Sequence, residues 1–301
     1  MNGEDLALLT TEANDPRYAQ IDRMSVGELA ATMNDADATV PAAVRAALPQ
    51  IVAAIDGIAA RMARGGRLVY VGAGTAGRLG VLDASECAPT FNTPPGLVVA
   101  LIAGGPAAVV TPSEGAEDDP ATGAAAVADA GVGPLDSVVG IASSGRTPYA
   151  VGAIRRAREL GAFTVGLTAN AGSPLSRVAE QPIEVVVGPE VLSGSTRLKA
   201  GTAQKLVLNM ISTITMVQLG KTYGNLMVDV RPTNHKLRER AVRIVRQTTG
   251  TGDAAARAAL EAAGWDVKVA AVTLRLGVEV PAARDRLAAA GGRLRDAFGE
   301  A

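Results

Sequence analysis

Short apolar runs alternate with helix-like stretches through the middle of the chain. Five runs rich in Val, Ile and Leu are six to nine residues long, a pattern typical of buried strands in a parallel sheet. They are residues 67–72, 97–105, 137–143, 163–168 and 183–188. Between the third and fourth runs, Thr147 and Pro148 would cap and begin a helix that Gly161 ends. This order predicts a doubly wound α/β fold around a mainly parallel five-stranded sheet.

Helical periodicity flanks the strand region on both sides. Upstream, apolar residues at helical spacing run from Val40 to Met62, and Pro49 is expected to bend this helix. Downstream of about Lys221 the pattern is helical and contains no strand candidate. We therefore predict an N-terminal helical segment over 1–64, an α/β domain over 65–222 and a small C-terminal helical domain over 223–301.

Composition and charge exclude several classes of protein. The net charge of −1 gives no bulk attraction to nucleic acid or to an anionic membrane. Cys87 is the only cysteine, which excludes an internal disulfide and a site of several thiolates and fits a reducing compartment. No basic segment leads into an apolar run at the N-terminus, and the apolar segment 206–219 is too short to span a bilayer. We expect a soluble, cytoplasmic protein with no nucleic-acid or membrane partner.

The loop after the first strand candidate has the glycine spacing G-x-G-x-x-G. Gly72, Gly74 and Gly77 would let the backbone turn sharply and direct N–H groups at an anion from a helix N-terminus. A dinucleotide site also needs an acidic residue at the end of the next strand, but residues 102–105 are Ile-Ala-Gly-Gly. No lysine follows the glycines as in a P-loop. The anion is therefore expected to be a phosphate on some other ligand.

A second loop rich in hydroxyl groups follows the third strand candidate, at residues 143–147. Because neighbouring parallel strands end at the same edge of a sheet, the two loops would form one pocket for a compact phosphate. Three to five charge-assisted hydrogen bonds, each worth roughly 1.5–3 kcal/mol, would hold a sugar phosphate there without a metal. Either loop alone is equally consistent with an ordinary strand-to-helix turn.

A third segment, residues 192–205, follows the fifth strand candidate and leads into the most apolar helix. Its hydroxyls, Lys199 and the helix start could complete the phosphate shell or contact the sugar. The alternative is a capped helix with solvated charges. We expect the phosphosugar contacts at Gly74, Thr75, Gly77, Arg78, Ser143, Ser144, Gly145, Thr147, Ser195 and Lys199.

The loop pair resembles the phosphosugar-binding sugar isomerase (SIS) domain. Four further segments narrow the resemblance, over nearly the whole chain, to the N-acetylmuramic acid 6-phosphate etherase family; they are residues 82–90, 114–119, 188–205 and 223–230. The resemblance implies hydrolysis of the ether between D-lactate and C3 of that sugar phosphate, to N-acetylglucosamine 6-phosphate and D-lactate, in cell-wall sugar recovery. It implies no cofactor and no metal, and it places the catalytic carboxylates at Glu86 and Glu117.

Two carboxylates suit this chemistry. In the open-chain sugar the aldehyde acidifies the C2 proton, so a carboxylate can remove that proton while a carboxylic acid protonates the departing lactate oxygen. We assign Glu117 as the base and Glu86 as the acid, and their environments should push the two pKa values apart. A straight helix from Thr75 would place Glu86 about 15 Å from the phosphate loop. The helix should therefore end near residues 83–85, or a partner subunit should supply Glu86.

Two other functions remain open from the sequence. A glucokinase regulatory protein shares these loops and senses a sugar phosphate without catalysis, but it resembles two such domains in tandem. An aldose–ketose isomerase would also take the C2 proton and would release no lactate.

Ala76 departs from the etherase pattern, which commonly has serine there, so other hydroxyls must contact the phosphate. Apolar surface over residues 44–62 and 206–216 predicts a homodimer, and the terminal helices resemble a ubiquitin-associated-type module.

Overall fold

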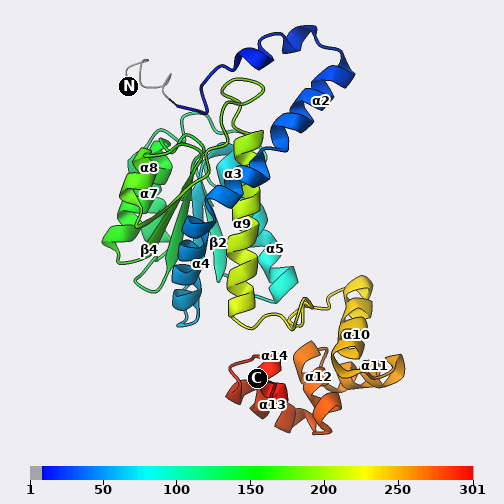
Figure 1. The fold of residues 1–301 in the computed structure, drawn as a ribbon. Coiled ribbons are helices and arrows are strands. Elements are labelled where there is room, and N and C mark those ends of the chain that lie inside the picture. The colour runs from blue at the N-terminus through cyan, green and yellow to red at the C-terminus, as the bar shows by residue number, and fades with distance from the viewer. Residues whose placement is uncertain (1–8, 301) are drawn as a thin grey trace. The chain divides into compact units, whose positions relative to one another are not determined.

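The computed structural model describes residues 9–300, which form two compact units (Figure 1). Unit 1 contains the described residues up to Ala84 together with Gly96–Ser212. Unit 2 contains Ser85–Pro95 and the described residues from Thr213 onward. The expected boundaries after residues 64 and 222 stay predictions, and the first expected segment begins outside the described residues.

Helices and short 3-10 turns precede the sheet. They are η1 (Pro16–Tyr18), η2 (Ile21–Arg23), α2 (Val26–Asp37), α3 (Val40–Ala46) and α4 (Leu48–Met62). The single bent helix expected over 40–62 is instead two helices, because the chain breaks at Ala47, where the segment 26–46 meets α4 at an angle of 60°. Pro49 lies in the first turn of α4, where no intrahelical bond needs its missing N–H. No single described helix is long and apolar enough to cross a bilayer; only the bent pair formed by residues 26–46 and 48–62 meets the length and composition criteria jointly.

The five strands form one parallel sheet in the order β2-β1-β3-β4-β5. They are β1 (Leu68–Gly72), β2 (Val98–Ile102), β3 (Ser137–Ile141), β4 (Phe163–Thr168) and β5 (Gln181–Glu184). The sheet and its helices confirm the predicted doubly wound α/β fold.

The fifth strand lies earlier than the sequence indicated. It pairs with β4 from Gln181 to Glu184, and the chain leaves the sheet after Val185 donates to the carbonyl of Thr168 (2.8 Å). The prediction of a strand over 183–188 was wrong because β4 ends at Thr168 and offers no further partner. Pro182 is tolerated because β5 is an edge strand, where one side of the backbone is not hydrogen-bonded to the sheet.

Helices cover both faces of the sheet (Figure 1). On one face, Val69, Val71 and Val138 share a buried core with Ile154 of α7 and Leu175 of α8. On the other face, α4 and α5 approach closely at glycines, Gly57 against the ring of Phe163 and Gly80 against Tyr70. The bounds in unit 1 are α5 (Gly74–Phe91), η3 (Pro106–Val109), α6 (Pro120–Asp129), α7 (Pro148–Glu159), α8 (Pro174–Val178) and α9 (Lys199–Gln218), of which α5 and α9 continue into unit 2.

Unit 2 is helical, as predicted, with its own apolar core. Its helices are α10 (His235–Thr249), α11 (Asp253–Ala262), α12 (Val267–Leu276), α13 (Val280–Ala289) and α14 (Leu294–Phe298). A buried lysine on α12, Lys268, donates to Asp229 (2.8 Å) and to the carbonyls of Gly220 (3.0 Å) and Gly292 (2.7 Å). These bonds fix the segments before α10 and before α14 against α12.

Candidate active site

The strand order places the first and second loops side by side. Gly72 at the end of β1 pairs with Ile141 at the end of β3, although β2 lies between them in the sequence. The chain passes from β1 to β2 on one side of β1, and from β2 it crosses back to β3 on the other side of β1. This reversal of direction opens a crevice beyond the ends of β1 and β3. Open α/β sheets bind ligands at such a switch point. The predicted neighbouring positions of the two strand ends are confirmed, and one common phosphate pocket for the two loops stays a prediction.

The glycines of the first loop have different roles. Gly74 has φ +52° and open space around its Cα, so it makes the turn into α5. At Gly77 a Cβ would lie 2.7 Å from the carbonyl oxygen of Gly72 and 2.7 Å from the side chain of Ile102. Gly77 therefore lets α5 start directly against the sheet. The methyl of Thr75 lies 3.6 Å from the point where Gly201 of α9 would carry a Cβ, which brings the third segment next to this loop.

A pocket of about 320 Å³ joins the first loop to the acidic segment. Gly74 and Arg78 line it together with Glu114 and Glu117. The carbonyl oxygen of Glu117 accepts from the backbone N–H of Tyr149 (3.0 Å), which ties the acidic segment to the first turn of α7. One of the two predicted catalytic carboxylates thus shares a pocket with the predicted phosphate loop.

The second loop presents hydroxyls whose partners differ. Ser143 Oγ accepts from Gln204 Nε2 of α9 (3.0 Å), and Ser144 Oγ accepts from the backbone N–H of Arg146 (3.2 Å). Gly145 has φ +67°, and a Cβ there would lie 2.2 Å from Ser173 Oγ. Thr147 is the N-cap residue and Pro148 the first helical residue, as predicted, but the Thr147 hydroxyl makes no capping hydrogen bond to the helix start.

A buried carboxylate just before the third segment organises the start of α9, and no motif in the sequence predicted it. The carboxylate of Glu190, 1% exposed, accepts from the backbone N–H groups of Lys199 and Ala200 (both 2.9 Å) at the start of α9. Lys199 Nζ donates to the carbonyl of Val187 (2.8 Å), and burial lowers the pKa of this lysine while the charge of Glu190 partly opposes the shift. The carboxylate of Glu190 thus occupies the helix start at which the sequence suggested a phosphate contact. Phosphosugar contacts by Ser195 and Lys199 stay predictions.

The N-terminal segment also reaches these loops. The side chain of Asn170, after β4, accepts from the N–H of Thr10 (2.9 Å) and donates to Thr11 Oγ1 and to the carbonyl of Ser143 (both 3.1 Å). Ser193 Oγ donates to the carbonyl of Glu12 (3.3 Å). No motif in the sequence predicted these contacts, which hold residues 10–12 against the loops that follow β3, β4 and β5.

Comparison with known proteins agrees with this geometry. The glucokinase regulatory protein N-terminal SIS domain matches residues 50–158, and the SIS domain matches residues 122–214. The N-acetylmuramic acid 6-phosphate etherase of Streptomyces avermitilis is 60% identical over 99% of this chain and 96% of its own length. That of Rubrobacter xylanophilus is 59% identical over 99% of this chain and 98% of its own length. The chain belongs to the N-acetylmuramic acid 6-phosphate etherase family.

The solved structures add information on the fold alone. A phosphoheptose isomerase from Francisella tularensis superposes with a TM-score of 0.51 at 18% identity, covering 64% of this chain and all of its own. The superposition therefore shows a shared fold over about two thirds of this chain.

In this member of the etherase family, Glu86 lies on a helix that does not end where it was expected to. Helix α5 continues from Gly74 to Phe91 and contains Pro89 in its last turn. The expectation of an end near residues 83–85 was wrong, because a proline so near the C-terminus removes only one of the last intrahelical bonds. The rise of about 1.5 Å per residue leaves Glu86 about 15 Å along the helix from the phosphate loop. Glu86 and Glu117 are both exposed.

One turn before Glu86, α5 carries a buried carboxyl group that no motif in the sequence predicted. Asp83 is 6% exposed and accepts from Tyr70 Oη of β1 (2.7 Å) and from Ser212 Oγ of α9 (3.0 Å). Burial raises the pKa of Asp83, and the two hydroxyl donors oppose part of this shift. These bonds join α5 and α9 over the sheet and so hold the two helix starts that flank the crevice.

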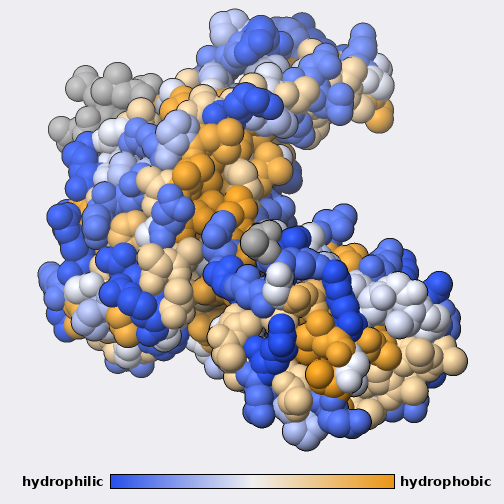
Figure 2. Space-filling view, turned by 60° about the horizontal axis from the view of Figure 1, so that its bottom comes forward, coloured by the Kyte–Doolittle hydropathy of each residue, from blue (hydrophilic) through white to orange (hydrophobic). Residues whose placement is uncertain are grey.

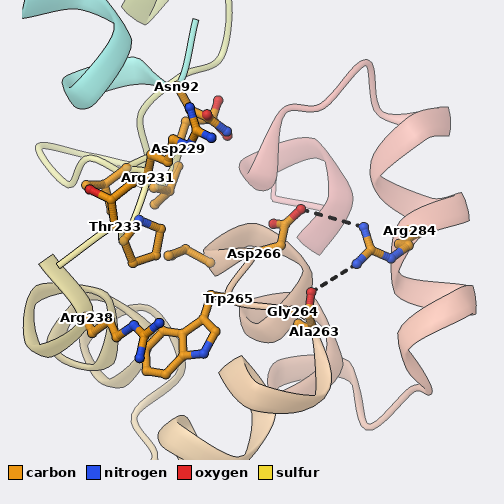
Figure 3. A pocket seen from close by; sticks show the side chains of 14 residues that line it. Asn92, Asp229, Arg231, Thr233, Arg238, Ala263, Gly264, Trp265, Asp266 and Arg284 are labelled. Carbon is orange, nitrogen blue, oxygen red and sulfur yellow. Dashed lines mark hydrogen bonds and ion pairs between the residues drawn. The ribbon is translucent and has the colours of Figure 1, made fainter. Parts of the chain in front are cut away.

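A second cavity, of about 530 Å³, lies within unit 2 (Figure 3). Its charged groups are largely paired inside the protein: Arg284 donates to the carbonyl of Ala263 (3.0 Å) and lies 3.8 Å from Asp266. The guanidinium of Arg238 stacks over the ring of Trp265, 4.9 Å from its centroid. Because these charged side chains already bind other groups of the protein, the crevice beside β1 and β3 is the better candidate for a phosphosugar.

Proposed function

We propose that this protein cleaves the D-lactyl ether of N-acetylmuramic acid 6-phosphate, giving N-acetylglucosamine 6-phosphate and D-lactate, in cytoplasmic recovery of cell-wall amino sugar. The relatives named for this reaction support the substrate. The observation that carries the proposal is the pocket that Glu117 shares with Gly74 and Arg78, because it brings a carboxylate next to the glycine loop that we expect to bind the phosphate.

The reaction divides between binding and proton transfer. N–H groups of the first turn of α5 and the hydroxyls of Ser143 and Ser144 hold the phosphate. Glu117 takes the C2 proton, the C–H electron pair forms the C2–C3 double bond, and the C3–O bond breaks as Glu86 protonates the lactate oxygen. Water then adds across the double bond, with its hydroxyl at C3 and a proton at C2.

We further propose a homodimer in which Glu86 of the partner subunit completes each site. The length of α5 supports this, since Glu86 lies about 15 Å from the phosphate loop of its own helix. Figure 2 shows apolar side chains gathered on one face of unit 1, and Leu48 and Val52 of α4 are 38% and 52% exposed. Such a patch suits a two-fold interface.

A lactate assay tests the reaction. Wild-type protein given N-acetylmuramic acid 6-phosphate should release D-lactate, and Glu86→Gln and Glu117→Gln should each lose most of that activity. In D₂O, Glu117→Gln should also lose exchange of the C2 proton. A ketose phosphate product without lactate would instead mark an isomerase, and tight sugar phosphate binding without turnover would mark a regulator.

Mixing the two inactive variants tests the shared site. If Glu86 acts across the dimer, each Glu86→Gln/Glu117→Gln heterodimer has one complete site, and the unfolded and refolded mixture should recover about a quarter of wild-type activity. If each chain uses its own Glu86, no heterodimer has a complete site and the mixture stays inactive. Sedimentation of the wild type as a monomer would also contradict the proposal.

A further inference from the structure

The start of α9 lies along both loops of the crevice. Gly201 faces the methyl of Thr75 in the first loop, and Gln204 Nε2 donates to Ser143 Oγ in the second loop (3.0 Å). Gly201 and Gln204 are three residues apart and so lie on one face of the helix. This face therefore contacts the two segments that are expected to hold the phosphate.

A contribution to the stability of the fold does not explain why position 204 is a glutamine. Its side chain is 2% exposed, and its Oε1 has no hydrogen-bond partner among the described residues. Whichever way the amide is oriented, one of its two polar ends stays unpaired. An unpaired amide group in a protein interior destabilises the fold, and an apolar side chain of the same length, such as methionine, would avoid that cost. A function at this position would account for the polar side chain.

The bond from Gln204 determines what Ser143 can do. A serine hydroxyl has one hydrogen to donate and lone pairs that accept. Because an amide N–H already occupies a lone pair of Ser143 Oγ, the hydroxyl hydrogen points to another acceptor. Phosphate oxygens at neutral pH are acceptors that need donors.

We infer that Gln204 is a positioning residue that holds the Ser143 hydroxyl as a hydrogen-bond donor to the phosphate of the sugar. The inference rests on the proposed phosphosugar site and does not depend on the cleavage step. Gln204 itself acts through Ser143 and needs no contact with the ligand.

A double-mutant cycle read by calorimetry with N-acetylglucosamine 6-phosphate tests this. Gln204→Met should weaken binding about tenfold, as expected for one lost donor to a charged group, and Ser143→Ala should weaken it similarly. In the Ser143→Ala background, Gln204→Met should change the affinity less than twofold. The melting temperature of Gln204→Met should equal or exceed that of the wild type.

The direction of the hydrogen bond has its own test. In Gln204→Glu a carboxylate would accept the Ser143 hydrogen and turn a lone pair toward the ligand, so binding should fall well beyond the loss in Gln204→Met. Gln204→Leu serves in place of Gln204→Met if that variant does not fold, with the same expected loss of affinity.

Two results would overturn the inference: an unchanged affinity in Gln204→Met, or an equal loss with and without the Ser143 hydroxyl. The second would mean that Gln204 acts only by packing. Wild-type protein that binds the sugar phosphate but releases no lactate would refute the proposed reaction and leave this cycle measurable.

Discussion

Replacing Glu190 by glutamine tests how far the start of α9 depends on one buried carboxylate. In the wild type each carboxylate oxygen accepts one backbone N–H, from Lys199 and from Ala200 (both 2.9 Å). Glutamine has a single acceptor oxygen, and its NH₂ group would face the other N–H donor. The substitution therefore removes one hydrogen bond and leaves a buried donor unpaired, with little change of shape.

The size of the effect follows from four contributions. A hydrogen bond to a charged group is worth about 1.5–3 kcal/mol, and a carboxylate at a partly buried helix N-terminus gains up to about 2 kcal/mol from the helix dipole. Relief of the buried charge offsets part of this loss. Lys199, whose pKa burial already lowers, also loses the opposing charge of Glu190. We expect unit 1 to lose about 2–4 kcal/mol of unfolding free energy.

Urea unfolding followed by far-UV circular dichroism measures this loss. Trp265, the only tryptophan, lies in unit 2 and reports that unit separately by fluorescence. Glu180→Gln is the matched control, because Glu180 is exposed and should change stability by no more than about 0.5 kcal/mol. Glu190→Gln should also raise KM, since the displaced helix start carries Gln204. A stability within about 0.5 kcal/mol of the wild type would refute the capping role.

Three further substitutions test other parts of the structure. Gly77→Ala should cost about 1–3 kcal/mol in urea unfolding and weaken sugar phosphate binding, because its Cβ would lie 2.7 Å from the Gly72 carbonyl oxygen; normal binding would show that α5 can shift without harm. Burial alone would raise the pKa of Asp136, but hydrogen bonds, chiefly from Arg67, lower it below the usual 3.8. The stabilisation is therefore present at neutral pH and lost as pH falls through the folded-state pKa, so the destabilisation by Asp136→Asn should shrink from pH 7 to pH 3; a constant difference would contradict this. Lys268→Met removes the three hydrogen bonds of a buried lysine and should cost unit 2 about 3–5 kcal/mol, measured in urea by Trp265 fluorescence; an unchanged unfolding midpoint would contradict this stabilising role.

The strands were predictable because burial on both faces makes their sequences continuously apolar. The four strands from β1 to β4 lie within the predicted runs. The fifth strand was predicted too far along the chain because Val185 and Val187 are typical strand residues, while Pro182 argues against a strand. Where a strand pairs is decided by its neighbour, and the end of β4 at Thr168 limited β5 in a way that no local pattern reveals.

The loops of the candidate site were predictable as separate motifs, and their partners were not. Glycine spacing and hydroxyls follow from the sequence, whereas the contact of Ser143 with Gln204 joins residues 61 positions apart. The same holds for Asp83 with Ser212, which are 129 positions apart. Such contacts depend on the packing of α5 and α9 over the sheet, so a polar residue in an apolar helix gives no sign of its partner.

Which anion binds at a helix start is the clearest example of a feature that the sequence could not predict. A helix N-terminus attracts a phosphate and a side-chain carboxylate for the same physical reason. At α9 the anion is Glu190. At α7 the first residue, Pro148, has no N–H, and the N–H of Tyr149 donates to the Glu117 carbonyl.

The start of helix α5 differs from the starts of α7 and α9. Its first turn has N–H groups that intrahelical bonds cannot use, and it opens at Gly74 into the pocket with Glu117. Of these three helix starts, α5 is therefore the one suited to bind an external phosphate. The site should accordingly select sugars with one phosphate over bisphosphates, which competition between N-acetylglucosamine 6-phosphate and a sugar bisphosphate would measure.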